Sequence, residues 1–366
     1  MNTILHLERN FLKKTESFIF NQINSIKNFN IKICAINNYN SFEKDFDVIL
    51  PSFSANSNFL KRNVTNTLYQ KISVNNIDLI HSHYLTDASY FYPLTSKFDC
   101  PKICSVYGYD VSEFPKRFLG LGKFYLKRVF MSYDKIIAMS PDMENDLISI
   151  GCPSEKILVH YYGTDVSRYV SIIKDYSLTN NILKILTIGS LFEKKGHESV
   201  LKSLSLLKDI INFEYNIVGE GPLFEYLRNL SIELNIDDRV NFLGHVPYNN
   251  NISYYQNADL FILTSVTSKT GNKEGIPGVI VEGMASGLPV ISTKHAGIPY
   301  VLRQDETGLL ACENDYETIA SYILSLYESE HLRKSLGIKA REYAQNYLNL
   351  EIQSNKLELI YKSFIF

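Results

Sequence analysis

Short apolar runs alternate with helix-like segments along the 366-residue chain, and this alternation restricts the possible folds more than any single motif. The apolar runs of the first half are predicted strands at Thr3–Leu7, Ile31–Ile36, Val48–Leu50, Asp78–His81, Ile103–Val106, Lys135–Met139 and Ile157–His160. Helical patterns lie between them near 15–29, 55–72, 86–97, 116–132 and 141–149. Strands that alternate with helices predict a parallel sheet with helices on both faces.

The second half repeats this alternation. Its predicted strands are Ile185–Ile188, Tyr215–Val218, Val240–Leu243, Leu260–Leu263 and Val290–Ser292. Its helices are expected near 196–209, 222–235, 249–257, 277–286, 315–328 and 330–346, with one more at 350–366. The polar segment between the halves lacks clear periodicity and is the predicted linker. We therefore predict an α/β fold of two Rossmann-like domains, with boundaries at 1–165 plus 347–366, linker 166–182, and 183–346.

The stretch from Lys273 to Thr293 holds two carboxylates, Glu274 and Glu282, with seven residues between them. Pro277 suits a first helical position, and the residues after it are apolar on nearly every side, so the helix should be buried. A carboxylate at Glu282 would then need hydrogen-bond donors, which a ligand's hydroxyl groups could provide. The free N–H groups of the first turn favour an anion near Glu274. A core helix with one salt-bridged glutamate explains the same pattern about equally well.

Several glycine turns follow predicted strands of the second half. Gly189–Gly196 follows one strand, opens a helix and contains Lys194 and Lys195, which suits a phosphate group. Gly219-Glu-Gly-Pro222 and the turn at Gly244 follow the next two strands, and Thr264-Ser265 ends another just before Glu274. Because these turns share one predicted sheet edge, together they favour a nucleotide-diphosphate site more than any one of them does.

Polar residues also lie at strand ends in the first half. His81-Ser82-His83 follows one predicted strand and Tyr107-Gly-Tyr-Asp110 follows another. Open α/β sheets bind ligands at that edge, although a helix cap or a loop hydrogen bond is an equal explanation for His83 and Asp110. The segment 116–129 mixes cations with large apolar residues, so it could lie on an anionic membrane surface; a solvated amphipathic helix is the commoner explanation.

Charge and composition exclude other classes. The net charge of −2 argues against nucleic acid as the main partner. The N-terminal residues reach a charge at Glu8 before any long apolar run, and no run approaches the length of a membrane span, so neither a secretory signal nor a span is expected. The five cysteines lack the two pairs of a zinc site and are expected to be free, buried thiols in a reducing cytoplasm.

As an ordered set, these motifs resemble the family 4 retaining glycosyltransferases of the GT-B fold, most closely the bacterial exopolysaccharide and colanic-acid members. The resemblance covers almost the whole chain. Its strongest block runs from Ser265-Val-Thr through Glu274-Gly-Ile-Pro to Glu282-Gly-Met-Ala-Ser-Gly-Leu-Pro, and continues at Ala296-Gly-Ile-Pro299 and Thr307-Gly-Leu-Leu310. Further matches are Thr15-Glu-Ser-Phe-Ile19, Ile80-His-Ser-His83, Val106-Tyr-Gly-Tyr-Asp110 and Tyr161-Tyr-Gly-Thr-Asp165.

The resemblance implies a two-domain enzyme whose domains face each other across a cleft, with the C-terminal helix crossing back to the first domain. It implies that Glu274 holds donor-sugar hydroxyls, that Glu282 binds the ribose, and that Lys195 neutralises the diphosphate. The remaining donor-side residues that it implies are Ser190, Lys194, Gly221, Val246, Ser265, Gly275, Ile276, Pro277, Gly278 and Val279. Tyr107 would lie near the reaction centre, and the acceptor-side residues would be Thr15, Glu16, His83 and Asp110.

The implied reaction moves a sugar, with retention and without a metal or cofactor, from a UDP- or GDP-linked donor to a glycan or lipid-linked oligosaccharide of a bacterial surface polysaccharide. The implied location is cytoplasmic, peripheral to the inner face of the cell membrane through 116–129. Two positions depart from the family pattern, which usually has Arg at Ser190 and His at Tyr107. Alternatives are a donor-binding or scaffold subunit whose chemistry has lapsed, and a nucleotide-sugar epimerase on the same fold.

Overall fold

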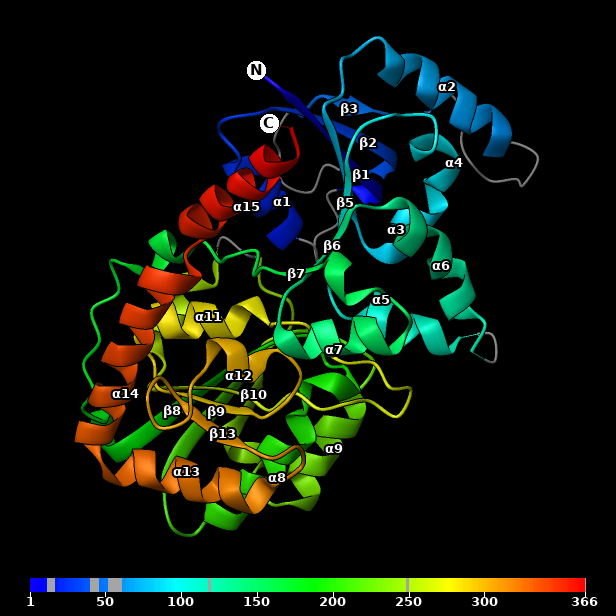
Figure 1. Cartoon of the computed structure of the whole chain (residues 1–366). Coiled ribbons are helices and arrows are strands. Elements are labelled where there is room, and N and C mark those ends of the chain that lie inside the picture. Colours follow the sequence, from blue (N-terminus) through cyan, green and yellow to red (C-terminus); the bar gives the residue numbers. More distant parts are fainter. Residues whose placement is uncertain (12–16, 40–45, 52–60, 118–119, 248–249, 366) are drawn as a thin grey trace. The chain divides into compact units, whose positions relative to one another are not determined.

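The computed structural model describes residues 1–11, 17–39, 46–51, 61–117, 120–247 and 250–365 (Figure 1). The chain divides into two compact units, Met1–Gly163 with Leu350–Phe366 and Thr164–Asn349. These divisions fall within three residues of the predicted boundaries at 165 and 347. Residues 166–182, predicted to be a linker, group with the second unit.

The first unit is built on a parallel sheet of seven strands in the order β3-β2-β1-β4-β5-β6-β7. The strands are β1 (Thr3–Phe11), β2 (Asn30–Asn38), β3 (Val48–Ile49), β4 (Leu79–His83), β5 (Lys102–Ser105), β6 (Lys135–Ala138) and β7 (Ile157–Val159). All seven predicted strands are therefore present. The strand order changes direction between β1 and β4, which is where Rossmann-type sheets bind ligands.

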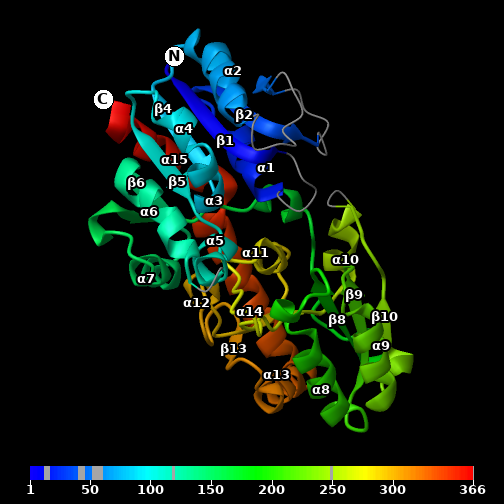
Figure 2. The ribbon, with the colours of Figure 1, turned by 90° about the vertical axis from the view of Figure 1, so that its right-hand side faces the viewer.

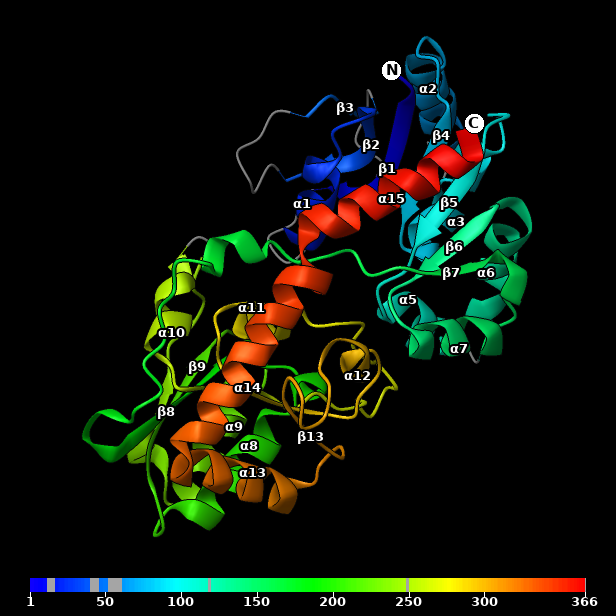
Figure 3. The ribbon, with the colours of Figure 1, turned by 60° about the vertical axis from the view of Figure 1, so that its left-hand side comes forward.

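Helices cover both faces of this sheet, since alternate residues of each strand point to opposite sides. The helices are α1 (Ser17–Ser25), α2 (Lys61–Ser73), α3 (Leu85–Tyr90), α4 (Tyr92–Thr95), α5 (Tyr109–Ser112), α6 (Gly122–Ser132), α7 (Pro141–Ser149) and α15 (Leu350–Ile365). Leu5, Leu7 and Ile80 pack on one face against α2 and α4. Ile4 and Leu79 pack on the other face against α15, which lies beside α1 (Figure 3).

Two predictions for this unit are corrected. His81, Ser82 and His83 do not follow β4 but lie in it and are fully buried, because the strand continues to His83. The helix predicted over 86–97 is two helices, since Pro93 lies in the first turn of α4 and cannot donate a backbone hydrogen bond to continue α3.

The second unit repeats the architecture with a parallel sheet in the order β10-β9-β8-β11-β12-β13. The strands are β8 (Ile182–Ile188), β9 (Asn212–Val218), β10 (Val240–Phe242), β11 (Leu260–Leu263), β12 (Val290–Thr293) and β13 (Leu309–Ala311). The sequence missed β13, which has three residues and follows directly on Gly308. The order is again that of a Rossmann sheet, with its switch between β8 and β11.

The helices of this unit are α8 (His197–Leu207), α9 (Phe224–Glu233), α10 (Ile252–Asn257), α11 (Gly278–Ala285), α12 (Ile298–Val301), α13 (Tyr316–Glu328) and α14 (Glu330–Tyr343). A core of apolar residues joins the sheet to α8, α9 and α13, and α8 and α13 lie side by side (Figures 1 and 3). Figure 2 shows β8, β9 and β10 as neighbours, with α9 and α10 beside them. A π-helical turn at Ala344–Leu348 leads from α14 to α15.

The five cysteines are free, as expected. Cys34, Cys104 and Cys152 are buried, but Cys312 is exposed and Cys100 is partly exposed, so burial was predicted too broadly. Among the described residues, no helix combines the length and the apolar character that a membrane crossing needs.

Candidate active site

Three glycine turns meet at the carboxyl end of the second sheet. The N–H of Gly189 donates to the carbonyl of Val218, and the N–H of Gly219 donates to the carbonyl of Gly244 at 2.8 Å. A Cβ on Gly219 would lie 2.0 Å from the carbonyl oxygen of Gly189, so only glycine allows these backbones to approach so closely. The turn at Gly221 packs in the same way on Leu191. The predicted grouping of these turns is confirmed.

Two lysines of the first turn contact Glu274. They lie in a 3-10 turn at Glu193–Lys195, between β8 and α8. The Nζ atoms of Lys195 and Lys194 lie 2.9 and 3.5 Å from Oε1 of Glu274. Burial by itself would raise the pKa of this carboxyl, but Lys195 and then Lys194 outweigh it and lower the pKa. Glu274 is therefore ionised at neutral pH, beside two cations.

His295 and Glu313 fix the backbone of this loop, and neither residue was predicted from the sequence. The N–H of Glu274 donates to Nε2 of His295 at 3.1 Å, while Nδ1 of His295 lies 2.6 Å from Oε1 of Glu313. Because Nε2 accepts a hydrogen bond, Nδ1 carries the ring hydrogen and donates it to the carboxylate. Glu313 also accepts a hydrogen bond from the N–H of Thr267 at 2.9 Å. A histidine after β12 and an acid after β13, both at the same sheet edge, could have pointed to this pair.

The helix α11 begins directly after this loop. Pro277 was predicted to be the first helical residue. It is instead the N-cap of the helix, because its ψ of 115° is extended. The first-turn N–H groups of Gly278 and Val279 have no acceptor within an α-helix, so they can bind an anion. Six of the eight residues of α11 are buried, which confirms that the helix is buried.

Glu282 lies in the buried part of α11 and has protein partners. Its Oε2 accepts hydrogen bonds from the hydroxyl of Tyr255 at 2.8 Å and from Nδ2 of Asn251 at 3.1 Å. Burial raises the pKa of this carboxyl, while Tyr255, Tyr169 and Arg168 oppose the shift. Glu282 therefore has the hydrogen-bond donors that its burial was predicted to require, and they are tyrosine and asparagine side chains of the protein. A role in ribose binding stays a prediction.

The other donor-side residues occupy the loops around this edge. Ser190 is half-buried, and its carbonyl accepts from Nε2 of His197 at 3.1 Å. Ser265 is fully buried, two residues after the end of β11. Val246 is half-buried in the loop after β10.

In the first unit, Asp110 is fully buried and ties two loops together. Its Oδ2 accepts from the N–H of Leu85 at 2.9 Å, and its Oδ1 accepts from the N–H groups of Tyr107 and Gly108 at 3.2 Å. Burial raises the pKa of this carboxyl to about 6, although the backbone donors lower it. This contact matches the loop hydrogen bond that the sequence left open as an explanation.

His83 and Tyr107 contact each other, with 2.6 Å between Nδ1 of His83 and the hydroxyl of Tyr107. The ring of Tyr107 packs between Phe18 and Tyr84. Thr15 and Glu16, the other predicted acceptor-side residues, lie outside the described residues.

Two Rossmann-like units in one chain, with the last helix returned to the first unit, define the GT-B fold. Residues 38–168 match the family model described as Glycosyltransferase Family 4, and residues 171–343 match that described as Glycosyl transferases group 1. The chain belongs to the family 4 glycosyltransferases with the GT-B fold, and the resemblance predicted from the motifs is confirmed.

Curated relatives agree with this assignment. The chain is 32% identical to the amylovoran biosynthesis glycosyltransferase AmsK of Erwinia amylovora over 231 residues. These residues cover 63% of this chain and 56% of AmsK. It is 31% identical over 233 residues to the putative colanic acid biosynthesis glycosyltransferase WcaL of Escherichia coli, covering 63% and 57%. The chain thus spans little more than half the length of these curated relatives.

Solved structures share the fold at low sequence identity. A glycosyltransferase from Rickettsia africae has a TM-score of 0.83 at 20% identity, covering 100% of this chain and 98% of that one. The Anabaena protein HepE, solved in complex with UDP and glucose, has a TM-score of 0.83 at 17% identity, covering 99% and 100%.

Proposed function

We propose that this glycosyltransferase moves a sugar from a nucleotide-diphosphate donor to a glycan or lipid-linked glycan of a bacterial surface polysaccharide. The observation that carries the proposal is the cluster of Lys194, Lys195 and Glu274 beside the first turn of α11. A carboxylate accepts hydrogen bonds from sugar hydroxyls, while lysines and free helix N–H groups attract a diphosphate. Both halves of a nucleotide-sugar thus have matching groups at one sheet edge.

In this proposal Glu274 holds hydroxyls of the donor sugar. Lys195, with Lys194 beside it, neutralises the diphosphate, and the backbone N–H groups of 275–279, except at Pro277, bind the same oxygens. Glu282 binds the ribose at the far end of the buried helix. The turns that border the nucleotide contain Ser190, Gly221, Val246 and Ser265.

The chemical step follows from this placement of charge. Negative charge grows on the departing diphosphate, so fixed cations and N–H groups act most strongly in the transition state. The lysines supply at this edge the positive charge that a metal ion supplies elsewhere, which supports a metal-independent reaction. Transfer in the presence of EDTA tests this point, and the anomeric configuration of the product, read by NMR, tests retention.

The donor and the acceptor are proposed from the relatives. HepE was solved with UDP and with UDP-glucose, which supports a uridine donor, with GDP-sugars as the alternative. The names of AmsK and WcaL refer to amylovoran and colanic acid, which supports an extracellular polysaccharide intermediate as the acceptor. Such acceptors carry lipid anchors when they are built at a membrane, so we place the enzyme in the cytoplasm, at the inner face of the cell membrane.

The surface of α6 supports membrane contact. Leu121, Phe124 and Met131 are 59, 60 and 72% exposed, and Lys123 and Lys127 stand exposed among them. Apolar side chains among cations bind an anionic bilayer surface. We expect the protein to sediment with vesicles that contain phosphatidylglycerol and not with purely zwitterionic ones. Phe124→Glu should abolish this binding, whereas Val74→Glu, at a residue of the same unit that is 83% exposed, should not.

A thermal-shift screen of UDP-, GDP- and ADP-sugars identifies the donor, and a transfer assay with that donor tests the proposal. We expect Glu274→Ala to abolish transfer to polysaccharide intermediates. Full activity in that variant would refute the assigned site. Conversion of the donor without an acceptor would indicate an epimerase. Donor binding without turnover for any acceptor would indicate a lapsed enzyme.

A further inference from the structure

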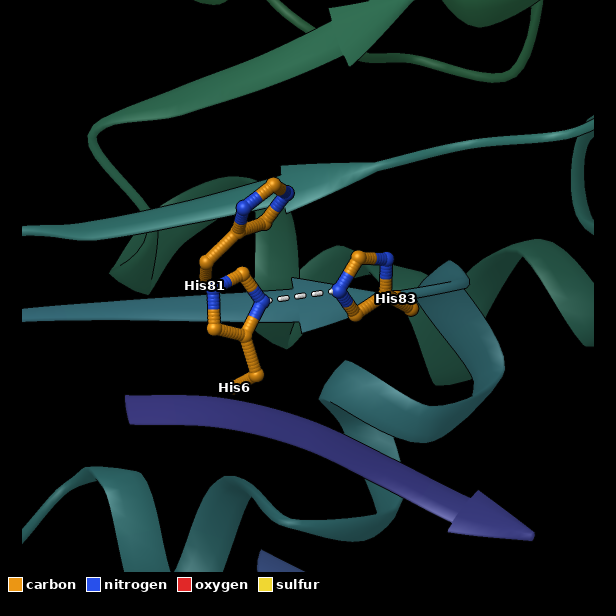
Figure 4. Close-up of side chains that lie close together, drawn as sticks. All are labelled: His6, His81 and His83. Carbon is orange, nitrogen blue, oxygen red and sulfur yellow. Dashed lines mark hydrogen bonds between the residues drawn. The ribbon is translucent and has the colours of Figure 1, made fainter. Parts of the chain in front are cut away.

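Three histidines are buried together at the strand-order switch of the first unit, His6 on β1 and His81 and His83 on β4 (Figure 4). Nδ1 of His6 lies 3.0 Å from Nε2 of His83. The two ring nitrogens of His81 lie 2.7 Å from the hydroxyl of Tyr361 and 2.8 Å from Oγ of Ser105. These rings therefore have hydrogen-bond partners within the protein, and the cluster is explained without a ligand.

The second unit has a cavity beside α8. Its volume is about 810 Å³, within the range of pockets that bind small molecules. Its walls come from the turn before α8, from the first half of α8, from α9, from the loop after β11 and from the start of α13. Lys194, Lys195 and Glu274 belong to the described residues and do not line it, so this cavity is distinct from the proposed donor site.

Three side chains of the cavity wall hold each other in place. Oε1 of Glu198 lies 2.7 Å from Nζ of Lys202, one turn further along α8, and Oε2 of Glu198 accepts a hydrogen bond from the hydroxyl of Tyr226 on α9 at 2.9 Å. These contacts leave lone pairs on the carboxylate and further N–H groups on the lysine. Because the side chains of Glu198 and Lys202 are 42 and 40% exposed, a ligand can reach them. The wall thus presents fixed acceptors and donors side by side.

Aromatic rings stand next to this polar wall. Phe192 and Tyr226 line the cavity and are 50 and 48% exposed. Tyr316 also lines it, and its ring centre lies 5.9 Å from Nζ of Lys202. The buried side chain of Val266 adds to the apolar part. Exposed aromatic rings beside hydrogen-bonding groups suit a sugar, since its C–H face packs on a ring while its hydroxyl groups bond to carboxylates and lysines.

The charges around the cavity balance. Glu193 and Glu198 are its acidic lining residues, and Lys202 and Lys269 are its basic ones. Burial lowers the pKa of His197, which also lines the cavity, to about 4, so this ring is uncharged at neutral pH. With no net charge, the cavity does not attract phosphates or acidic sugars over a long range, and it favours a neutral ligand.

We propose that this cavity is a second carbohydrate site, which binds a neutral stretch of a glycan chain away from the donor site. The inference rests on the proposed function for the class of ligand, because a polysaccharide intermediate is the glycan that the enzyme would meet. A chain bound here is held on the same unit as the nucleotide-sugar. Intermediates long enough to occupy this cavity while one end accepts the sugar therefore bind more tightly than short ones.

Binding of tetrasaccharides to the whole chain tests the site without a transfer assay. We expect at least one of cellotetraose, laminaritetraose and maltotetraose to give saturation-transfer NMR signals and a Kd of about 1 mM or lower, and acidic tetragalacturonate to bind no better. Absence of binding by every neutral sugar would overturn the proposal, and so would stronger binding of tetragalacturonate. The nucleotide selected by the thermal screen should not displace the bound sugar, because displacement would mean that the sugar occupies the donor site.

Variants of the wall test which residues bind the tetrasaccharide. Tyr226→Ala should raise its Kd about fivefold or more, since the variant lacks both the ring and the hydroxyl that holds Glu198. Tyr226→Phe keeps the ring and should weaken binding less. Glu198→Gln should weaken binding about fivefold, because an amide oxygen accepts hydrogen bonds less strongly than a carboxylate.

Tyr347→Ala is the matched control, at a tyrosine of the same unit that is 57% exposed and that the structure describes outside the cavity. It should leave the Kd unchanged, and melting temperatures show whether each variant is folded. Equal weakening in Tyr347→Ala and Tyr226→Ala, or unchanged binding in a folded Tyr226→Ala variant, would contradict the proposal.

The donor site and this cavity can fail separately. Glu274→Ala should bind the tetrasaccharide as the wild type does, and loss of binding in that variant would overturn a separate site. If Glu274→Ala abolishes transfer while the wild type binds no neutral tetrasaccharide, the proposed function stands and this inference fails. Tetrasaccharide binding that depends on Tyr226, together with full transfer activity in Glu274→Ala, would refute the donor site and leave the cavity assigned.

Discussion

Nζ of Lys195 lies 2.9 Å from Oε1 of Glu274, and both side chains are largely buried, with 14 and 10% exposure. Lys195, which we propose binds the diphosphate, is therefore paired with Glu274, which we propose binds the sugar. A nucleotide-sugar that binds at this edge must break the ion pair, so that Lys195 can contact the diphosphate and Glu274 the sugar. Until the donor binds, each of the two charges is neutralised by the other.

Glu274→Gln should separate sugar binding from diphosphate binding. We expect UDP, or whichever nucleotide the thermal screen selects, to bind at least as tightly as to the wild type, because the variant frees Lys195 and Lys194. Sugar transfer should fall about a hundredfold or more, since the charged acceptor for sugar hydroxyls is lost. Calorimetry with the nucleotide and a transfer assay measure the two effects.

Lys195→Met should weaken nucleotide binding about tenfold or more, because it removes the cation proposed to bind the diphosphate. Lys202→Met, which removes a lysine paired with Glu198 on α8, is the control and should leave nucleotide binding unchanged. Equal weakening in Lys195→Met and Lys202→Met would mean that only the overall charge of the unit matters.

Glu313→Gln tests the support of the Glu274 loop. The carboxylate accepts hydrogen bonds from His295 on one oxygen and from Thr267 on the other, and an amide can accept only on one side. We expect a loss of about 1–3 kcal/mol in stability and about a tenfold loss in transfer rate, with nucleotide affinity little changed. Glu306→Gln, at a side chain that is 63% exposed, should behave like the wild type. Wild-type activity in Glu313→Gln would exclude a supporting role.

Gly196→Ala should disrupt the turn between β8 and α8. Gly196 has a φ of 69°, and an added Cβ would lie 1.8 Å from the carbonyl oxygen of Thr264, so the two loops must separate. We expect a loss of several kcal/mol in stability together with loss of donor binding. Gly151→Ala is the matched control, since its φ of 96° is also positive but no atom lies within 4 Å of the added carbon. Thermal melting of both variants separates the effect of the clash from that of backbone strain. Equal decreases in melting temperature would show that the clash with Thr264 contributes nothing.

The protein should lose stability as the pH falls from about 6.5 towards 4. Burial lowers the pKa of His6 to about 3 and of His160 and His197 to about 4. As the pH falls, these histidines therefore bind protons in the unfolded chain before they do so in the folded chain. Each of them lowers the free energy of unfolding by about 1.4 kcal/mol per pH unit. Burial raises the pKa of Asp110 to about 6. Its protonation therefore stabilises the folded state as the pH falls from about 6 to 4, and so opposes part of the loss.

Urea unfolding at pH 7 and pH 5 measures this loss. The control is His331→Gln, at an exposed histidine, which should keep the full pH dependence. His160→Gln should reduce it. A midpoint that is equal at both pH values would contradict the prediction.

Much of the fold could be predicted because its signals are local. Seven strands of the first unit and five of the six in the second follow from apolar runs between polar segments. The exception is β13, whose three residues are too few for a pattern. The end of β4 was misplaced because His81 and His83 are polar residue types, and only the packing of α15 over them explains their burial in a strand.

The candidate site divides in the same way. The glycine turns, Lys195 and Glu274 lie in motifs with recognisable spacing. His295 and Glu313 lie on loops after different strands and become partners only when β12 and β13 pair, so no local pattern connects them. The donors to Glu282 likewise come from Tyr255 and Asn251, about thirty residues upstream, so the need for donors could be predicted but the residues that provide them could not.

The return of α15 to the first unit has a consequence for synthesis on the ribosome. Residues 1–163 leave the ribosome long before 350–366, whereas 164–349 form an uninterrupted unit. The nascent first sheet therefore exposes Ile4 and Leu79 until residues 350–366 have been made, and only then can His81 pair with the hydroxyl of Tyr361. A chain cut short by a late stop codon would keep a complete second unit beside an uncovered first sheet, which makes it a substrate for chaperones and proteases.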